Sequence, residues 1–444
     1  MSKNGGQWHF KKILLKEGWA ENVTVEVGAG GLISGLHRDS KGGGEKVSGI
    51  AIPAMLNAHS HAFQRAFAGL TEKRGKEGDD FWAWRQVMYR ALKAIGPDEL
   101  EAIAAQVYVE MLKSGYAGVA EFHYLHHQAD GTPYDNKAEM SEAIIRAAGA
   151  AGIDLTLVPV LYQRSDFGAD TVEPGQRPFF NTLEDFRELL AGLKGKCRSG
   201  LALHSLRAVP EEVLAEAAAL TEGPVHIHIA EQTREVEACL EAHGQRPVEW
   251  LLENADVDAR WNLVHATHVM VEEVTGLAKS GATVVLCPTT EANLGDGIFP
   301  FEDYSGAGGR FAIGSDSQVS IDPREELRLL EYGQRLTSGK RAIAGVHPGA
   351  ALWTRAAAGG AAAMGYEKSQ IQVGAPAHIA VLDDRSAALI GGNCDQILDA
   401  LVFAGQPTPV KDVMVSGTWR VRDFHHPKET AVRARFNKAV KELA

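Results

Sequence analysis

The sequence predicts an α/β protein: a (β/α)8 TIM barrel with a small β-sandwich domain formed by both chain termini. Eight short apolar runs alternate with amphipathic helical stretches between residues 54 and 317. A barrel of eight strand–helix units takes about 250 residues. Strand-like segments with glycine-rich turns precede this region, and similar segments follow it. We therefore expect a catalytic barrel over 53–369 and a small β domain over 1–52 and 370–444.

The composition narrows the classes of protein. Of the 444 residues, 45% are hydrophobic and 23% charged, as in folded globular proteins. The formal net charge of −12, without any basic run, argues against nucleic acid or an anionic membrane as a partner. We expect no signal peptide and no membrane span. The four cysteines form no Cys-x-x-Cys pair, which favours the cytoplasm and argues against a cysteine-based zinc site.

Strand-like segments flank the barrel runs on both sides along the chain. HFKKILL, NVTVEVGAGGLISGL and KVSGIAI, all before residue 53, read as antiparallel strands. The eight barrel runs lie at 54–61, 118–124, 154–162, 200–206, 224–231, 261–268, 283–290 and 310–317. Helical stretches at 97–115 and 137–152 close on glycine, as helix C-caps do. After residue 370, the segments GAPAHIAVLDD, DQILDALVFAG and VKDVMVSGTWRV read as strands again, while AAAGGAAAMG before them reads as a packing helix.

Polar side chains gather where the barrel runs end, and in such a barrel these ends surround the active site. They are His59 and His61 in run one, His204 and Arg207 in run four, His226, His228 and Glu231 in run five, His265 in run six and Asp316 in run eight. Residues two apart on a strand point to the same face, so His59 and His61 can both face the barrel axis. A His-x-His pair alone could be a core pair; matching groups on other strands favour a metal site.

Three imidazoles and one carboxylate suit zinc or iron(II), with a further position open to water. The candidate ligands are His59, His61, His228 and Asp316. We prefer His228 to His226 because it lies nearer the carboxyl end of its run. Glu231, three residues further on, is placed to move protons beside the metal rather than to bind it.

The motifs HSH, HIAE, HATH and GSDS resemble the amidohydrolase superfamily over essentially the whole chain. Binuclear, hydantoinase-like members carry a carboxylated lysine on strand four, where GLALHSLRAV has none. HIAE is typical of the mononuclear deaminase branch. The resemblance thus implies one divalent ion, most simply Zn²⁺ although Fe²⁺ also suits the set, and hydrolysis of a C–N bond with release of ammonia. It also implies a homodimer.

Two arginines indicate the substrate class. Arg85 lies among aromatic residues in FWAWRQVMYR, and Arg207 ends the fourth run. Arginine is the natural bidentate partner of a carboxylate. Each arginine alone could serve packing or the surface, but two near one metal in an acidic protein favour a small dicarboxylate substrate.

Together with CPTTEANLGDGIFP and EFHYLHH, these segments resemble the formimidoylglutamate deiminases. Those enzymes of bacterial histidine degradation convert N-formimino-L-glutamate and water to N-formyl-L-glutamate and ammonia. The resemblance implies that Asp316 takes a proton from water, Glu231 protonates the leaving nitrogen and His265 stabilises developing charge. The substrate pocket it implies consists of Gln64, Arg85, Tyr124, His204 and Arg207. One departure, PAHIAVLDD where Ala-Asp-Leu is frequent, concerns packing only.

Two alternatives stay open. An aromatic deaminase of the same branch, acting on guanine or an adenosine derivative such as S-adenosylhomocysteine, would share every ligand and differ only in the pocket. A non-catalytic scaffold would keep the barrel without the chemistry. The sequence leaves undecided the native metal, the oligomeric state, the choice among formimino amino acids and the subunit whose pocket Arg85 serves.

Overall fold

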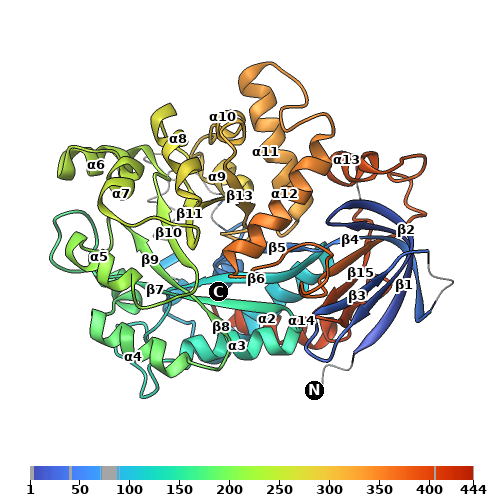
Figure 1. The fold of residues 1–444 in the computed structure, drawn as a ribbon. Helices are drawn as coiled ribbons and strands as arrows, with labels where there is room; N and C mark the ends of the chain where they lie inside the picture. Colours follow the sequence, from blue (N-terminus) through green and yellow to red (C-terminus); the bar gives the residue numbers. More distant parts are fainter. Residues whose placement is uncertain are drawn as a thin grey trace.

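The computed structural model describes residues 5–39, 43–70, 72, 88–89, 91–404 and 407–443. It confirms the predicted fold class: a parallel eight-stranded barrel stands beside a mixed sheet that both termini build (Figure 1). Among the described residues, no helix combines the length and the apolar character that crossing a bilayer requires.

Each of the eight apolar runs contains one barrel strand, and the strands pair in chain order. They are β5 (Met55–Ser60), β6 (Tyr116–His123), β7 (Asp154–Leu161), β9 (Leu201–Ser205), β10 (Val225–Ile229), β11 (Trp261–His265), β12 (Thr283–Leu286) and β13 (Arg310–Ile313). The two-residue strand β8 (Arg198–Ser199) pairs with β7 outside this path. A parallel bridge between Ser60 and Asp316 joins the first strand to the segment after the last, so the barrel closes at its carboxyl end.

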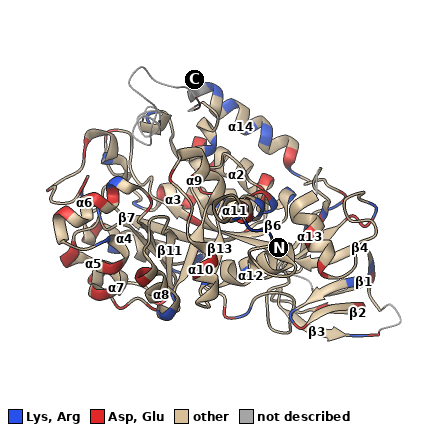
Figure 2. Cartoon of the chain, turned by 90° about the horizontal axis from the view of Figure 1, so that it is seen from above, with Lys and Arg blue, Asp and Glu red and all other residues tan. Residues whose placement is uncertain are grey.

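Helices and short 3-10 turns connect the strands. They are η1 (Ala62–Phe67), α2 (Pro97–Ser114), α3 (Glu139–Ala151), η2 (Pro174–Phe179), α4 (Leu183–Leu193), α5 (Glu211–Ala218), α6 (Thr233–His243), α7 (Pro247–Asn254), α8 (Val271–Ser280), α9 (Pro288–Leu294), α10 (Phe301–Gly306), α11 (Pro323–Ser338) and α12 (Pro348–Ala363). The predicted glycine caps are confirmed: Gly115 and Gly152 end α2 and α3 in the left-handed region, with φ of 110° and 82°. Figure 2 shows that α5, α6 and α7 carry several acidic residues.

The termini form one continuous sheet of seven strands in the order β16-β15-β14-β4-β1-β2-β3, where a sandwich was expected. Its strands are β1 (Gly6–Leu15), β2 (Gly18–Val27), β3 (Ile33–His37), β4 (Glu45–Pro53), β14 (Ile379–Leu382), β15 (Val410–Val415) and β16 (Thr418–Val421). β14 pairs antiparallel with β4 and thereby joins the two ends of the chain. The apolar core of this sheet includes Phe10, Val25 and Ile379. The domain boundaries at 52 and 370 stay a prediction.

One segment differs from the expectation. Residues 395–404, expected as a strand, form helix α13 (Asp395–Ala404). Its buried residues Ile397, Leu398, Leu401 and Val402 recur at helical spacing. They pack α13 against α11 and α12, so tertiary contacts decide between two structures that a short apolar run allows. A last helix, α14 (Glu429–Leu443), lies against α2.

Candidate active site

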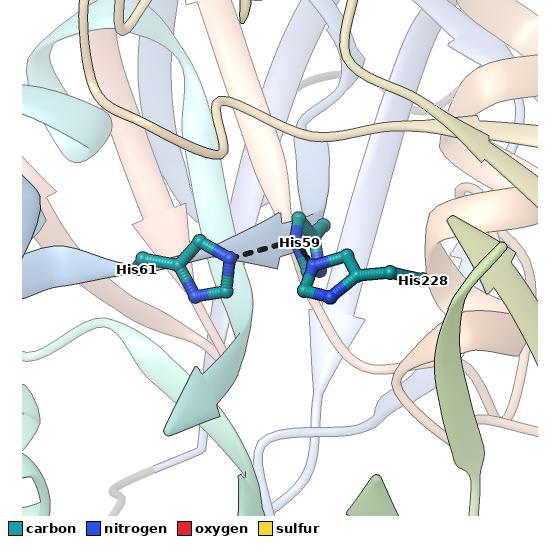
Figure 3. Close-up of side chains that lie close together, drawn as sticks. All are labelled: His59, His61 and His228. Atoms are coloured by element: carbon teal, nitrogen blue, oxygen red, sulfur yellow. Dashed lines mark hydrogen bonds between the residues drawn. The ribbon is translucent and has the colours of Figure 1, made fainter. Parts of the chain in front are cut away.

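Three histidines bring their Nε2 atoms together at the carboxyl end of the barrel (Figure 3). His59 lies on β5, His61 follows that strand directly, and His228 lies on β10. The Nε2 of His59 lies 3.1 Å from the Nε2 of His61 and 3.0 Å from the Nε2 of His228. All three side chains are buried, so the cluster is shielded from bulk water.

The other ring nitrogens fix the tautomers of two of these histidines. The Nδ1 of His61 lies 2.9 Å from the carbonyl oxygen of Phe122, and the Nδ1 of His228 lies 3.1 Å from that of His204. A carbonyl only accepts, so each Nδ1 carries the proton and each Nε2 presents a lone pair to the centre. Burial lowers the pKa of His61 to about 3, so its ring is neutral. Two such lone pairs beside the Nε2 of His59 form a site that suits a cation.

Asp316 completes the donor set. Its Oδ1 lies 3.3 Å from the Nε2 of His61 and 3.7 Å from the Nε2 of His59. Ligands that hold zinc tetrahedrally at 2.0–2.1 Å are about 3.3 Å apart. The distances of Asp316 from His59 and His61 and the chemistry of its carboxylate fit a divalent cation shared with the histidines, although Asp316 also lies in a second group with His265 and Cys287.

His265 lies between the carboxylates of Asp316 and Glu231. The Nε2 of His265 lies 3.6 Å from Asp316 Oδ2 and 3.7 Å from Glu231 Oε1. Burial lowers the pKa of His265, but the carboxylates of Glu231, Glu291 and Asp316 outweigh it and raise that pKa to about 10. Burial also raises the pKa of Asp316 to about 7. An imidazole between two carboxylates beside the metal position is suited to proton transfer.

The backbone is strained where these side chains emerge. Ala230, His265 and Asp316 adopt φ of 49°, 69° and 44°, in the left-handed region that non-glycine residues avoid. Each costs roughly 1 kcal/mol or more. These residues lie just after β10, at the end of β11 and just after β13. The sharp turns carry the side chains toward the barrel axis.

Three buried polar residues that the sequence analysis did not assign hold the site in place. The Nδ1 of His265 lies 3.2 Å from Glu291 Oε1. Glu121 accepts hydrogen bonds from Ser60 Oγ and the Ala62 amide, both at 2.6 Å. The third is Asn57, whose Oδ1 accepts the amide of His59 at 3.2 Å. Glu121 and Asn57 interrupt apolar runs and Glu291 follows one, the only signal that the sequence offers.

The site opens into a cavity of about 610 Å³, part of it open to solvent. Predicted residues that line it are His61, Gln64, Tyr124, His204, Arg207, His228, Glu231, His265 and Asp316. His59 lies outside this lining, and Gln64 Nε2 donates to Tyr124 Oη at 2.9 Å. Tyr162, Phe179 and Thr290 also line the cavity without having been predicted. Tyr162 ends the third run, so the rule applied to the other runs could have found it.

Arg207 presents its guanidinium to the same cavity. Its Nη1 donates to the carbonyl oxygen of Ser165 at 3.1 Å, and the part of the chain that the structure describes offers it no ion pair. Arg164 anchors this segment by donating to the carbonyl oxygens of Leu206 and Arg207 at 3.0 Å. The second predicted arginine, Arg85, lies outside the described residues.

His226, which we ranked below His228 as a ligand, points elsewhere. Its Nε2 lies 3.0 Å from the carbonyl oxygen of Ala363 in α12, and its ring is fully buried. It therefore ties the barrel to that helix.

Comparison with known proteins gives a consistent picture. The model of the amidohydrolase family matches residues 50–420. A formimidoylglutamate deiminase from Pseudomonas aeruginosa is 48% identical over 98% of both chains. A 5-methylthioadenosine/S-adenosylhomocysteine deaminase from Halobacterium salinarum is 29% identical over 95% of this chain and 94% of its own.

Solved structures agree with this. An amidohydrolase from Brucella melitensis superposes with a TM-score of 0.95 at 44% identity and covers 99% of both chains. An adenosine deaminase from Xanthomonas campestris, solved with bound zinc, superposes with a TM-score of 0.80 at 21% identity over 98% of both chains. The second likeness concerns the fold alone.

Proposed function

This chain belongs to the amidohydrolase family, and we propose that it hydrolyses N-formimino-L-glutamate to N-formyl-L-glutamate and ammonia. The observation that carries this proposal is a cavity lined both by His61 and His228 of the histidine cluster and by Arg207, which makes no ion pair within the described residues. The similarity to a formimidoylglutamate deiminase over nearly the whole chain supports it. Guanine offers Arg207 no carboxylate, which disfavours a deaminase of purine bases; S-adenosylhomocysteine carries one carboxylate and is distinguished by the substrate series below.

We propose His59, His61, His228 and Asp316 as the ligands of one divalent ion. Zinc suits three imidazoles and a carboxylate, and iron(II) is the other ion that this set accepts. When bound, such an ion lowers the pKa of water and so supplies a nucleophile near neutral pH.

Side chains of the protein then transfer the protons. Asp316, whose pKa burial raises to about 7, accepts the proton that water loses as its oxygen attacks the formimino carbon. Glu231 donates a proton to the terminal nitrogen, and the proton held by Asp316 follows it, because ammonia leaves far more easily than amide anion. The hydroxyl proton of the intermediate returns to Glu231 as the C–N bond breaks. His265, between these two carboxylates, stabilises the charge that develops before the C–N bond breaks.

The far end of the cavity holds the glutamate moiety. Arg207 is our proposed partner for one of its carboxylates, and Arg85 for the other. Gln64, Tyr124 and His204 orient the chain between the reacting carbon and these arginines. Positioning of this kind contributes several kcal/mol to catalysis.

A substrate series tests the proposal. Ammonia release is measured with N-formimino-L-glutamate, N-formiminoglycine, guanine and S-adenosylhomocysteine. We expect kcat/KM to fall at least about 100-fold for the glycine compound, since it lacks one carboxylate. Faster turnover of either purine compound contradicts the proposed substrate. The homodimer and the cytoplasmic location stay predictions; sedimentation of the purified protein tests the former.

A further inference from the structure

A glutamate without an assigned role holds the turn that carries Glu231. Strand β10 ends at Ile229, and the chain reverses at Ala230, where φ is 49°. Glu235, in the first turn of α6, reaches back to this turn. Its Oε1 accepts the amide of Ala230 at 3.1 Å, and its Oε2 accepts the amide of Glu231 at 3.0 Å. Both carboxylate oxygens are thus committed to two successive backbone amides.

This arrangement offsets an unfavourable backbone. An alanine in the left-handed region costs about 1 kcal/mol or more. Hydrogen bonds from amides to a carboxylate are stronger than those between neutral groups. The amino end of α6 further favours the negative charge of Glu235. The turn is therefore stable because Glu235 supports it.

Glu235 also lies close to two residues with proposed roles, Glu231 and Arg207. It lines one small cavity together with Glu231 and Arg207. Burial raises the pKa of Glu235 to about 7, and Glu231 adds to this effect, whereas Arg207 and the two amides oppose it. The charges of both Glu231 and Arg207 thus act on the carboxyl group of Glu235.

We propose that Glu235 is a positioning residue that aims Glu231 at the reacting carbon and at His265. The inference rests on the proposed function only for the role of Glu231 as proton donor. Glu235 itself does not line the main cavity, so it acts through the backbone of Glu231. Its loss should then lower kcat, while the binding of the glutamate carboxylates, and hence KM, should change little.

The variant Glu235→Gln tests this with little change in shape. Its single amide oxygen can accept only one of the two amides, and its NH₂ group faces the other. We expect kcat to fall 10–100-fold, as for supporting groups around metal sites, with KM within about threefold and metal content unchanged. Glu235→Asp keeps two acceptor oxygens and should restore part of kcat. The exposed Glu237 on the same helix provides the control: Glu237→Gln should keep wild-type kinetics.

A double-mutant cycle separates positioning from general support of the fold. In a Glu231→Gln background there is no proton donor to aim, so adding Glu235→Gln should lower kcat less than about twofold. The proposal is overturned if the kcat losses of the two single variants multiply in full in the double variant. It is also overturned if Glu235→Gln keeps the wild-type kcat. If Glu235→Gln does not fold, the same cycle with Glu235→Asp decides.

Failure of the proposed function is recognised separately. Wild-type protein that leaves N-formimino-L-glutamate untouched contradicts the substrate but not the positioning role. The cycle is then measured with S-adenosylhomocysteine or guanine, whichever the wild-type protein deaminates, and the same outcomes apply. If the wild-type protein deaminates none of the three, Glu231 has no proton to deliver and the positioning role is also wrong.

Discussion

The amide of Asp316 donates a hydrogen bond to the carbonyl oxygen of His59 over 3.1 Å, and the amide of His61 donates to the carbonyl oxygen of Asp316 over the same distance. The first and last barrel segments are therefore joined at three of the four proposed metal ligands. Closure of the barrel therefore brings these three proposed ligands together. An ion bound there should stabilise the fold by mass action.

Removal of the ion or of a ligand tests this coupling. We expect chelation to lower the Tm and abolish ammonia release, and His228→Ala to lose metal and activity together. Its metal affinity should fall more than about 100-fold, since even supporting residues cost 10–100-fold. His226→Gln, on the same strand but directed at Ala363, should retain one ion per chain. Full activity in His228→Ala contradicts the ligand assignment.

Asn57 links the same two barrel segments through its side chain. Its Nδ2 donates to Ser315 Oγ at 2.7 Å, and its Oδ1 accepts the amides of Ser315 and His59 at 3.2 Å. Asn57→Ala removes the acceptor of the buried amides of Ser315 and His59, so the free energy of unfolding should fall by about 2–4 kcal/mol. Urea denaturation measures this change. The exposed Asn393→Ala serves as control and should stay within about 0.5 kcal/mol of wild type.

Arg207→Ala should raise KM for N-formimino-L-glutamate about 10–100-fold, because a charged hydrogen bond contributes about 1.5–3 kcal/mol. Metal content should stay at the wild-type value. The KM of Arg207→Lys should lie between those of the wild type and Arg207→Ala, since an ammonium cannot bind a carboxylate in two parallel bonds. Arg187, ion-paired with Glu216 and absent from the cavity lining, gives the control Arg187→Ala. Steady-state kinetics measures these values. An unchanged KM for Arg207→Ala would contradict the assignment of Arg207 to the substrate pocket.

Asp154 makes stability depend on pH at the junction of barrel and terminal sheet. Its carboxylate contacts His378 Nε2 at 3.2 Å and the hydroxyl of Tyr366. Burial raises the pKa of Asp154, but His378, Tyr366 and Arg198 outweigh it and hold this pKa well below its usual value.

Since a lowered pKa favours the folded state only while the group is ionised, this contribution is complete above the unfolded pKa of about 3.9. It disappears as the pH falls through the folded value. The free energy of unfolding of the wild type should therefore exceed that of Asp154→Asn by about 2 kcal/mol at pH 7. This difference should narrow below about pH 4. Denaturation at several pH values measures it; a gap that is constant down to pH 3 contradicts this assignment.

The sequence predicts most of the barrel because buried strands and helical faces leave periodic patterns. It also indicates the metal cluster, since His59, His61, His228 and Asp316 each lie at a strand end, where one rule places them at the same rim. The strand predicted for residues 395–404 was wrong because this short apolar run fits a strand as well as a helix.

Supporting residues could not be read in this way. Glu235 and Glu291 lie in helices and reach back to a turn or a ring that only the folded chain brings near. Nothing in their spacing names the partner. Asn57 likewise meets Ser315 across 258 positions of sequence. Their roles follow from tertiary contacts alone.

The most direct test of the central claim is ammonia release from N-formimino-L-glutamate by purified protein, with metal content measured on the same sample. We predict rapid release of one ammonia per N-formyl-L-glutamate formed, with about one zinc or iron ion per chain. No release from this compound by metal-replete protein, together with release from guanine or S-adenosylhomocysteine, would contradict the assigned substrate. Release from guanine, which has no carboxylate, would also contradict our interpretation of Arg207.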